Sequence, residues 1–126
     1  MPHPNEQKLR TIYAALGRGD VPALLALLTH DVRYHISGRS LVSGDYVGHD
    51  GVVKLLTKFN ELSEGTFSVQ VLDILANDQH GVAFTMERAR RNGRTLENRA
   101  VHVYEFAEKV RRFWGYNEKV WDDFWV

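Results

Sequence analysis

Two histidines in strand-like segments are the first candidates for chemistry in this sequence. His35 lies in Val32–Gly38, an alternating run of β-branched and aromatic residues that ends in a Ser-Gly pair, and His102 lies in a second such run, Val101–Phe106. Because its free pKa is about 6.5, histidine is well suited to moving protons at neutral pH. If both rings face one cavity, they could serve as base and acid in a dehydration or a double-bond shift. The alternative is that both are ordinary polar residues on a wetted face of a sheet.

Other site chemistries have little support in the sequence. The chain contains no cysteine, which excludes disulfides, thiolate nucleophiles and cysteine-ligated metals. Its histidines show neither H-x-x-x-H nor H-x-H spacing. No glycine-rich phosphate loop lies between a strand and a helix, and no nucleophile-elbow pattern surrounds Ser37, Ser40 or Ser43. We therefore expect neither a metal nor a cofactor.

The elements that must position the histidines follow from the spacing of apolar residues. The first part of the chain is predicted to form three helices, over residues 5–17, 21–29 and 51–62. Asp20 and Asp50 are the expected N-caps of the second and third helices. From Thr66 onward apolar residues recur with period two, which predicts four long strands over residues 66–76, 81–91, 94–106 and 110–120. Short turns join these strands, so they must be antiparallel neighbours. The fold class is α+β, with the helices gathered on one face of the sheet.

Bulk properties limit the kinds of partner. The 126 residues fit a single domain, residues 1–126. Sixteen basic and sixteen acidic residues cancel, which argues against a surface for nucleic acid. The basic run Glu87–Arg94 surrounds an Asn-Gly turn and is interpreted as a solvated hairpin tip. Neither a leader peptide nor an apolar stretch of membrane-spanning length is found, so we expect a cytoplasmic protein with no membrane contact.

Several short motifs resemble those of a known family. The opening of the SnoaL-like polyketide cyclases resembles four segments of this chain: Gly19–Leu28 (GDVPALLALL), His30-Asp31-Val32, Gly38 and Gly48–Val52 (GHDGV). A fifth segment, Phe113–Glu118 (FWGYNE), looks like the family's final strand. This family lies in the superfamily of nuclear transport factor two and ketosteroid isomerase. The resemblance implies a cystatin-like α+β barrel, in which a cone-shaped, curved, mainly antiparallel sheet wraps around three N-terminal helices. It also implies a deep apolar pocket and, commonly, a homodimer formed through the outer face of the sheet.

The resemblance also suggests roles for individual residues. His35 falls where ketosteroid isomerase carries its general-base carboxylate, and His102 falls where that enzyme carries the protonated acid of its oxyanion hole. The isomerase's first-helix tyrosine corresponds to Ile12 here. Tyr13 is the next residue, and a one-residue shift along a helix turns a side chain by about 100°.

The last strand adds a further candidate. The cyclases carry an acidic base four residues after the last-strand tryptophan, and counting from Trp114 gives Glu118, which could equally be a surface residue. Alternation groups Trp114 and Tyr116 with Glu118, and it places Phe113, Gly115 and Asn117 on the opposite face. The two family comparisons disagree about which face looks inward, and the tryptophan-to-acid spacing favours the first set. The aromatic residues expected to line the pocket are Tyr13, Tyr46, Phe59, Tyr104, Trp114 and Tyr116.

These observations predict a pocket protein for a small, largely apolar carbonyl-, enol- or polyketide-like molecule. As an enzyme it would catalyse isomerisation, dehydration or aldol-type cyclisation, with His35 as base, His102 as acid or oxyanion donor, and Glu118 as an alternative base. A non-catalytic ligand carrier or a dimeric accessory module is the main alternative, and a protein-binding adaptor is another. The fold itself hosts all of these functions, so it does not choose among them.

Overall fold

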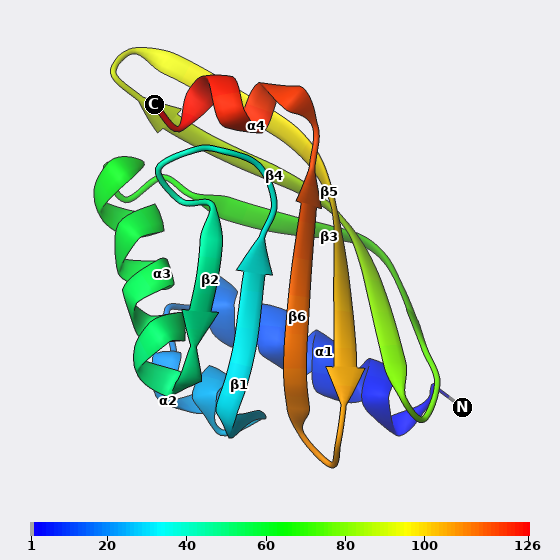
Figure 1. Cartoon of the computed structure of the whole chain (residues 1–126). Helices are drawn as coiled ribbons and strands as arrows, with labels where there is room; N and C mark the ends of the chain where they lie inside the picture. Colours follow the sequence, from blue (N-terminus) through cyan, green and yellow to red (C-terminus); the bar gives the residue numbers. More distant parts are fainter. Residues whose placement is uncertain (1) are drawn as a thin grey trace.

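A six-stranded mixed sheet forms the body of the protein (Figure 1). The structure is a computed structural model and describes residues 2–126. The strand order is β2-β1-β6-β5-β4-β3, and the strands are β1 Leu28–Ile36, β2 Gly44–Val47, β3 Ser68–Ala76, β4 His80–Arg91, β5 Arg94–Phe106 and β6 Val110–Asn117. Strands β1 and β6 are parallel, and the other neighbouring pairs are antiparallel. The α+β class is therefore confirmed, with one parallel pairing inside a mainly antiparallel sheet.

The helices differ in length more than the sequence suggested. They are α1 Pro4–Gly17, α2 Val21–Leu25, α3 Gly48–Leu62 and α4 Lys119–Phe124. The prediction of three full N-terminal helices is wrong for α2, which has only five residues although Asp20 caps it as expected. Its leucine-rich run continues into β1, where Leu28 is buried and pairs with Val110. The error arose because a short apolar run suits a buried strand as well as a buried helix.

Two further boundaries were misplaced. Helix α3 begins at Gly48 with Val47 at the N-cap, so Asp50 lies in the first turn, where its charge still favours the helix N-terminus. Strand β6 ends at Asn117, and the chain turns into α4 instead of continuing as a strand to Val120. This turn buries the aromatic C-terminal segment against α3, where Trp121 and Trp125 pack on Phe59.

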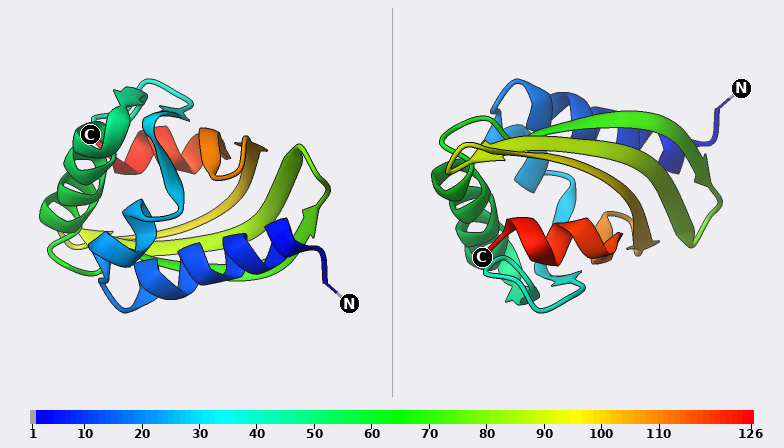
Figure 2. Two further views of the ribbon diagram at one scale, coloured as in Figure 1. Left: turned by 90° about the horizontal axis from the view of Figure 1, so that it is seen from below. Right: turned by 90° about the horizontal axis from the view of Figure 1, so that it is seen from above.

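The sheet is strongly curved, and the helices cover its inner face (Figure 2). Helix α1 packs beside β3 and β4, α3 packs beside β1 and β2, and α4 packs against β5. A bulge between Val71 and Asp73 interrupts the β3–β4 ladder, and bulges increase local twist. Side chains on a concave face converge, so residues from distant strands can meet there.

The β4–β5 hairpin sets the register of the inner face. At its tip Asn92 and Gly93 both have positive φ, 51° and 75°, as a two-residue hairpin turn requires. The pairing then runs without interruption from Arg91 and Arg94 to His80 and Glu105. Because side chains alternate, this register aims every second residue of β5, including His102, into the curved interior.

Candidate active site

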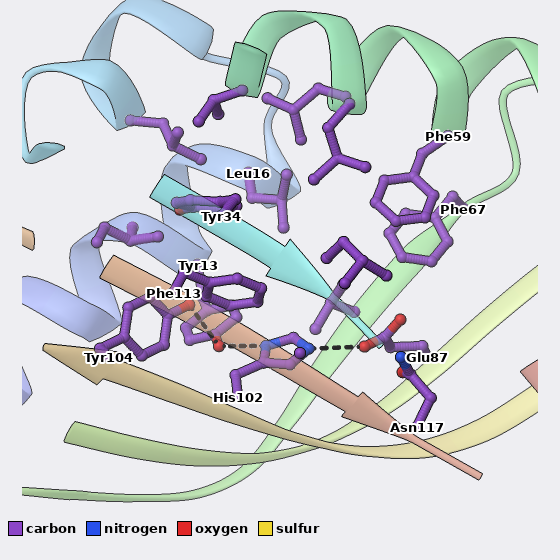
Figure 3. A pocket seen from close by; sticks show the side chains of 18 of the residues that line it. Tyr13, Leu16, Tyr34, Phe59, Phe67, Glu87, His102, Tyr104, Phe113 and Asn117 are labelled. Atoms are coloured by element: carbon purple, nitrogen blue, oxygen red, sulfur yellow. Dashed lines mark hydrogen bonds and ion pairs between the residues drawn. The ribbon is translucent and has the colours of Figure 1, made fainter. Parts of the chain in front are cut away.

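A cavity of about 60 Å³ lies between the concave sheet face and the helices. Apolar side chains from α1, α2, α3, β1 and β6 make up most of its wall. The polar groups in the wall belong to Tyr13, Tyr34, Glu87, His102, Tyr104, Asn117 and Trp121. Figure 3 shows that the tyrosines, His102 and Glu87 gather on the side of the cavity formed by the sheet and α1.

Four of these residues form one continuous hydrogen-bonded network (Figure 3). The hydroxyl of Tyr104 donates to the hydroxyl oxygen of Tyr13 at 2.7 Å, and that hydroxyl lies 2.6 Å from Nδ1 of His102. Nε2 of His102 lies 2.8 Å from a carboxylate oxygen of Glu87. One arrangement of protons satisfies all three contacts. Neutral His102 donates Nε2–H to ionised Glu87, and its Nδ1 accepts the O–H of Tyr13.

Three elements, α1, β4 and β5, supply the residues of the network, and the helical and strand repeats place those residues on the faces that meet. On α1, Leu9 and Ile12 are buried against the sheet, and Tyr13 lies beside them on the flank that faces the cavity. On β5, His102 and Tyr104 are two residues apart and therefore share the inner face. Glu87 reaches the same space from β4, so the site depends on the packing of α1 against the hairpin.

Burial controls the ionisation of the tyrosines. Desolvation raises the pKa of Tyr13 well above its ordinary value, and the charge of Glu87 raises it further, although the hydrogen bond from Tyr104 lowers it. Desolvation is also the main cause that raises the pKa of Tyr104 and of Tyr34. All three phenols therefore remain protonated at neutral pH. They can act as hydrogen-bond donors in the cavity and not as phenolate bases.

Glu87 is the most unusual member of the site. Glu87 is only 2% exposed, and burying a carboxylate costs free energy of folding unless the carboxylate is paired and hydrogen-bonded. His102, which is itself buried, supplies that partner. The interpretation of Glu87–Arg94 as a solvated hairpin tip is wrong for Glu87. An available signal was its place in an alternating row of β4 with Ala83, Thr85 and Ala89, all of which are buried.

His35 does not face the cavity. Its neighbours Tyr34 and Ile36 line the cavity wall, and alternation turns His35 to the opposite face of β1. There its Nδ1 lies 2.7 Å from Asp45 of β2, and its side chain is 46% exposed. The expectation that His35 and His102 share one chamber is therefore wrong. Counting back from Gly38 could not decide which face His35 takes, because a shift of one residue reverses the face of a strand.

The prediction of which face of β6 looks inward is wrong as well, because the tryptophan-to-acid spacing favoured the face that carries Trp114, Tyr116 and Glu118. Phe113, Gly115 and Asn117 line the cavity, whereas Trp114 and Tyr116 lie on the outer face. Glu118 is exposed, occupies the N-cap of α4, and accepts a hydrogen bond from the backbone N–H of Arg99 at 2.8 Å. These contacts fit the structural role that was its alternative, at the junction between β6 and α4.

The remaining aromatic candidates divide between wall and core. Tyr13, Phe59 and Tyr104 line the cavity, and their role in ligand binding stays a prediction. Tyr46 is buried elsewhere in the core, where its hydroxyl donates to the carbonyl oxygen of Val42 at 2.9 Å. The wall residues that were not predicted to line the pocket include Tyr34, Glu87 and Phe113.

The described residues show neither a metal-binding cluster nor a membrane-spanning helix. Across residues 2–126, no group of three His, Cys, Asp or Glu side chains is arranged to hold a metal ion. The helices within these residues are all too short or too polar to cross a membrane.

Comparisons with known proteins show which family has this architecture. The model of the SnoaL-like domain matches residues 9–113. The uncharacterized protein Rv0034 of Mycobacterium tuberculosis is 33% identical over 92 residues, which make up 72% of this chain and 70% of the relative. Bal32a, from a soil-derived mobile gene cassette, has a TM-score of 0.92 at 27% identity, covering 97% of this chain and 96% of its own. A Xanthomonas campestris protein of unknown function with a cystatin-like fold has a TM-score of 0.87 at 24% identity, covering 94% of this chain and 95% of its own.

The names of these three proteins state no activity. The two solved structures agree on the fold, and the domain match covers most of the chain, so the resemblance seen in the sequence motifs is confirmed. The chain belongs to the SnoaL-like domain family.

Proposed function

We propose that this protein is an enzyme that transfers a proton on a small, largely apolar carbonyl or enol compound, as in an isomerisation, a dehydration or an aldol-type cyclisation. The observation that carries the proposal is the Glu87–His102–Tyr13 network in a mostly apolar cavity wall. Titratable groups that are held by hydrogen bonds inside an apolar pocket are typical of acid–base active sites.

Glu87 is the base in this proposal. Among residues 2–126, His102 is the only hydrogen-bond partner of its carboxylate, and it uses one oxygen. Figure 3 shows the other oxygen turned away from His102, toward the cavity. That oxygen takes a proton from the carbon next to the substrate carbonyl. The C–H electron pair forms the enolate double bond, and the carbonyl oxygen gains the negative charge.

Tyr13 supplies the donor for that charge. Before the reaction its O–H is used by Nδ1 of His102. Glu87 then holds the abstracted proton as a neutral carboxylic acid, His102 keeps its one proton on Nε2, and the Tyr13 hydroxyl rotates away from Nδ1. The O–H of Tyr13 is then free to donate to the enolate oxygen. Glu87 thus holds the proton while Tyr13 stabilises the oxyanion.

The same proton completes the reaction. Its return to a different carbon of the enolate gives the isomerised product, and its transfer to a β-hydroxyl leaving group gives water and the dehydrated product. The apolar wall keeps bulk water from the reacting carbon and favours a substrate whose remaining surface is apolar.

The direct test uses cyclohex-3-enone as the probe. Isomerisation to the conjugated enone is followed by ultraviolet absorption, and exchange of the α-hydrogens in D₂O is followed by NMR. We expect wild type to accelerate both, and Glu87→Gln to lose at least about 100-fold of that activity. The matched control is His35→Gln, which changes a histidine outside the cavity. If wild type binds the ketone but neither isomerises nor exchanges it, the non-catalytic carrier replaces the enzyme as the better description.

A further inference from the structure

A second hollow lies directly beyond the inner cavity. This outer cleft, of about 370 Å³, is lined by residues of the α1–α2 connection on one side and of α3 on the other. Five side chains line both spaces and so form a partition between them: Leu16, Leu24, Leu56, Phe59 and Phe67. Figure 3 shows Leu16 above the tyrosines and the stacked rings of Phe59 and Phe67 at the far side from Tyr104.

The inner cavity is too small for a whole substrate of the proposed class. Its volume is about 60 Å³, whereas an apolar cavity known to bind benzene measures about 150 Å³. A cyclic or branched molecule that reaches Glu87 must therefore displace part of the partition. Leu16 and Leu56 are only half-buried, so their rotamers can change at smaller cost than those of fully packed core residues. Displacing them joins the inner cavity to the outer cleft.

The outer cleft has a distinctive polarity. Asp20, Thr57, Asn60 and Glu61 line it but not the inner cavity, and none of the described residues that line it is basic. One oxygen of Asp20 caps α2, and the other faces Arg18 at 3.3 Å. Glu61 is exposed at the end of α3. A carboxylate or phosphate placed here would meet like charge, whereas a neutral hydroxyl or amide or a cationic amine would not.

We propose that the substrate is an elongated molecule with two chemically different ends, one in the inner cavity and the other in the outer cleft. Resting on the function proposed above, this assigns the carbonyl- or enol-bearing end to Glu87 and His102. The other end is uncharged or cationic and lies between α3 and the α1–α2 connection. The partition side chains contact the middle of the molecule, which is apolar.

Phenols test this arrangement, because a phenol O–H resembles an enol and can donate to Glu87. The probes are phenol, 4-pentylphenol, and two chains of similar length that end in an amine or a carboxylate, namely 4-(5-aminopentyl)phenol and 5-(4-hydroxyphenyl)pentanoic acid. Dissociation constants are measured by calorimetry at pH 7. We expect 4-pentylphenol to bind at least tenfold tighter than phenol, and the amine to bind at least tenfold tighter than the carboxylate.

Two variants, each with a control, test whether the second end of the molecule lies in the outer cleft. Val53 lines only the outer cleft and is partly exposed, so Val53→Trp should fill the cleft, remove the gain from the pentyl chain and leave phenol binding unchanged. Lys54→Trp, at the next residue outside both linings, is the matched control and should change neither affinity. Glu61→Lys should reverse the preference between amine and carboxylate, whereas Glu64→Lys, outside the cleft, should not.

The results separate this inference from the function on which it rests. If phenol binds and Glu87→Leu abolishes that binding, but the pentyl chain adds no affinity, the two-ended substrate is wrong and the inner site stands. The inference is also overturned if Val53→Trp weakens phenol and 4-pentylphenol equally. If none of the phenols binds wild type, both the inner cavity as a binding site for enol-like groups and the two-ended substrate are rejected.

Discussion

Glu87 and His102 meet at 2.8 Å although they are not partners in the β4–β5 ladder. Glu87 pairs with Asn98, and His102 pairs with Ala83, so the two lie on a long diagonal of the sheet. The concave curvature of this face tilts their side chains toward each other. Thr85 and Ala100, the pair between them, are small enough to leave that path open. The contact at the centre of the site is thus a product of sheet curvature.

The first prediction concerns the stability of this pair. Glu87→Leu or His102→Leu alone leaves a buried polar partner without its hydrogen bond, and each should cost about 3–5 kcal/mol in the free energy of unfolding. The double variant removes both polar groups, so its cost should be much smaller than the sum. Urea denaturation of the four proteins measures the coupling. Strictly additive costs would show that the two side chains do not depend on each other.

The second prediction separates Tyr13 from Tyr104. Tyr13→Phe removes the hydroxyl that lies between His102 and the proposed substrate oxygen, so kcat for cyclohex-3-enone should fall by about 100- to 1000-fold. Tyr104→Phe removes only the donor behind Tyr13, and its effect on kcat should be near tenfold. Each change should cost about 1 kcal/mol of stability. Equal losses of kcat in the two variants would contradict the assigned order of the network.

The third prediction uses the histidine outside the cavity. His35→Gln breaks an exposed contact with Asp45, and exposed ion pairs contribute about 0–1 kcal/mol. Activity and melting temperature should therefore both stay close to wild type, while His102→Gln loses activity. Kinetics on the two variants side by side check this. A His35→Gln variant that is as inactive as His102→Gln would restore His35 to the mechanism.

The fourth prediction concerns alkaline pH. The pKa values of Tyr13, Tyr34 and Tyr104 are raised in the folded protein by desolvation, whereas in the unfolded chain they lie near 10. The folded state therefore keeps protons that the unfolded state loses. The stabilisation from these protons is fully present below about pH 10 and is lost as pH rises toward the folded pKa values.

Urea unfolding at pH 9, 10 and 11 measures this loss, which approaches about 1.4 kcal/mol per pH unit for each such tyrosine. Absorbance of phenolate should show these three residues ionising together with unfolding. Tyr104→Phe should make the decline in stability less steep. Ionisation of all the tyrosines near pH 10 in the still-folded protein would refute the prediction.

The fifth prediction is a homodimer through the outer face of the sheet, as the family resemblance implied. Ladder pairing aligns Val82, Val103 and Trp114 in one row and Phe84, Val101 and Tyr116 in the next. Phe84 and Tyr116 are 40% and 49% exposed in the single chain, and contiguous apolar surface of this kind favours association.

Light scattering after size exclusion tests the assembly. Wild type should have twice the chain mass, and Phe84→Glu should shift the protein toward the monomer. Leu41→Glu changes an apolar residue of similar exposure, 50%, in the loop between β1 and β2 and should leave the dimer intact. A monomeric wild type, or the same dissociation in both variants, would remove the outer face as the interface.

Much of the fold could be predicted because it depends on local patterns. Period-two alternation located the four long strands, the Asn-Gly pair located their tightest turn, and Asp20 was recognised as a helix cap. The early end of helix α2 and the whole of the final helix α4 were missed for one reason. Apolar and aromatic runs are compatible with either secondary structure, and only long-range packing decides between them.

The sequence by itself determined the family, the α+β class and which residues share a face of each strand. Tertiary structure alone decided which of those faces looks inward. A shift of one residue exchanges the two faces, and the difference in burial energy depends on strands far away in the chain. For that reason His35, Trp114, Tyr116 and Glu118 lie outside the cavity. The same long-range packing brought Glu87 in, because its pairing with His102 exists only once β4 and β5 curve around α1.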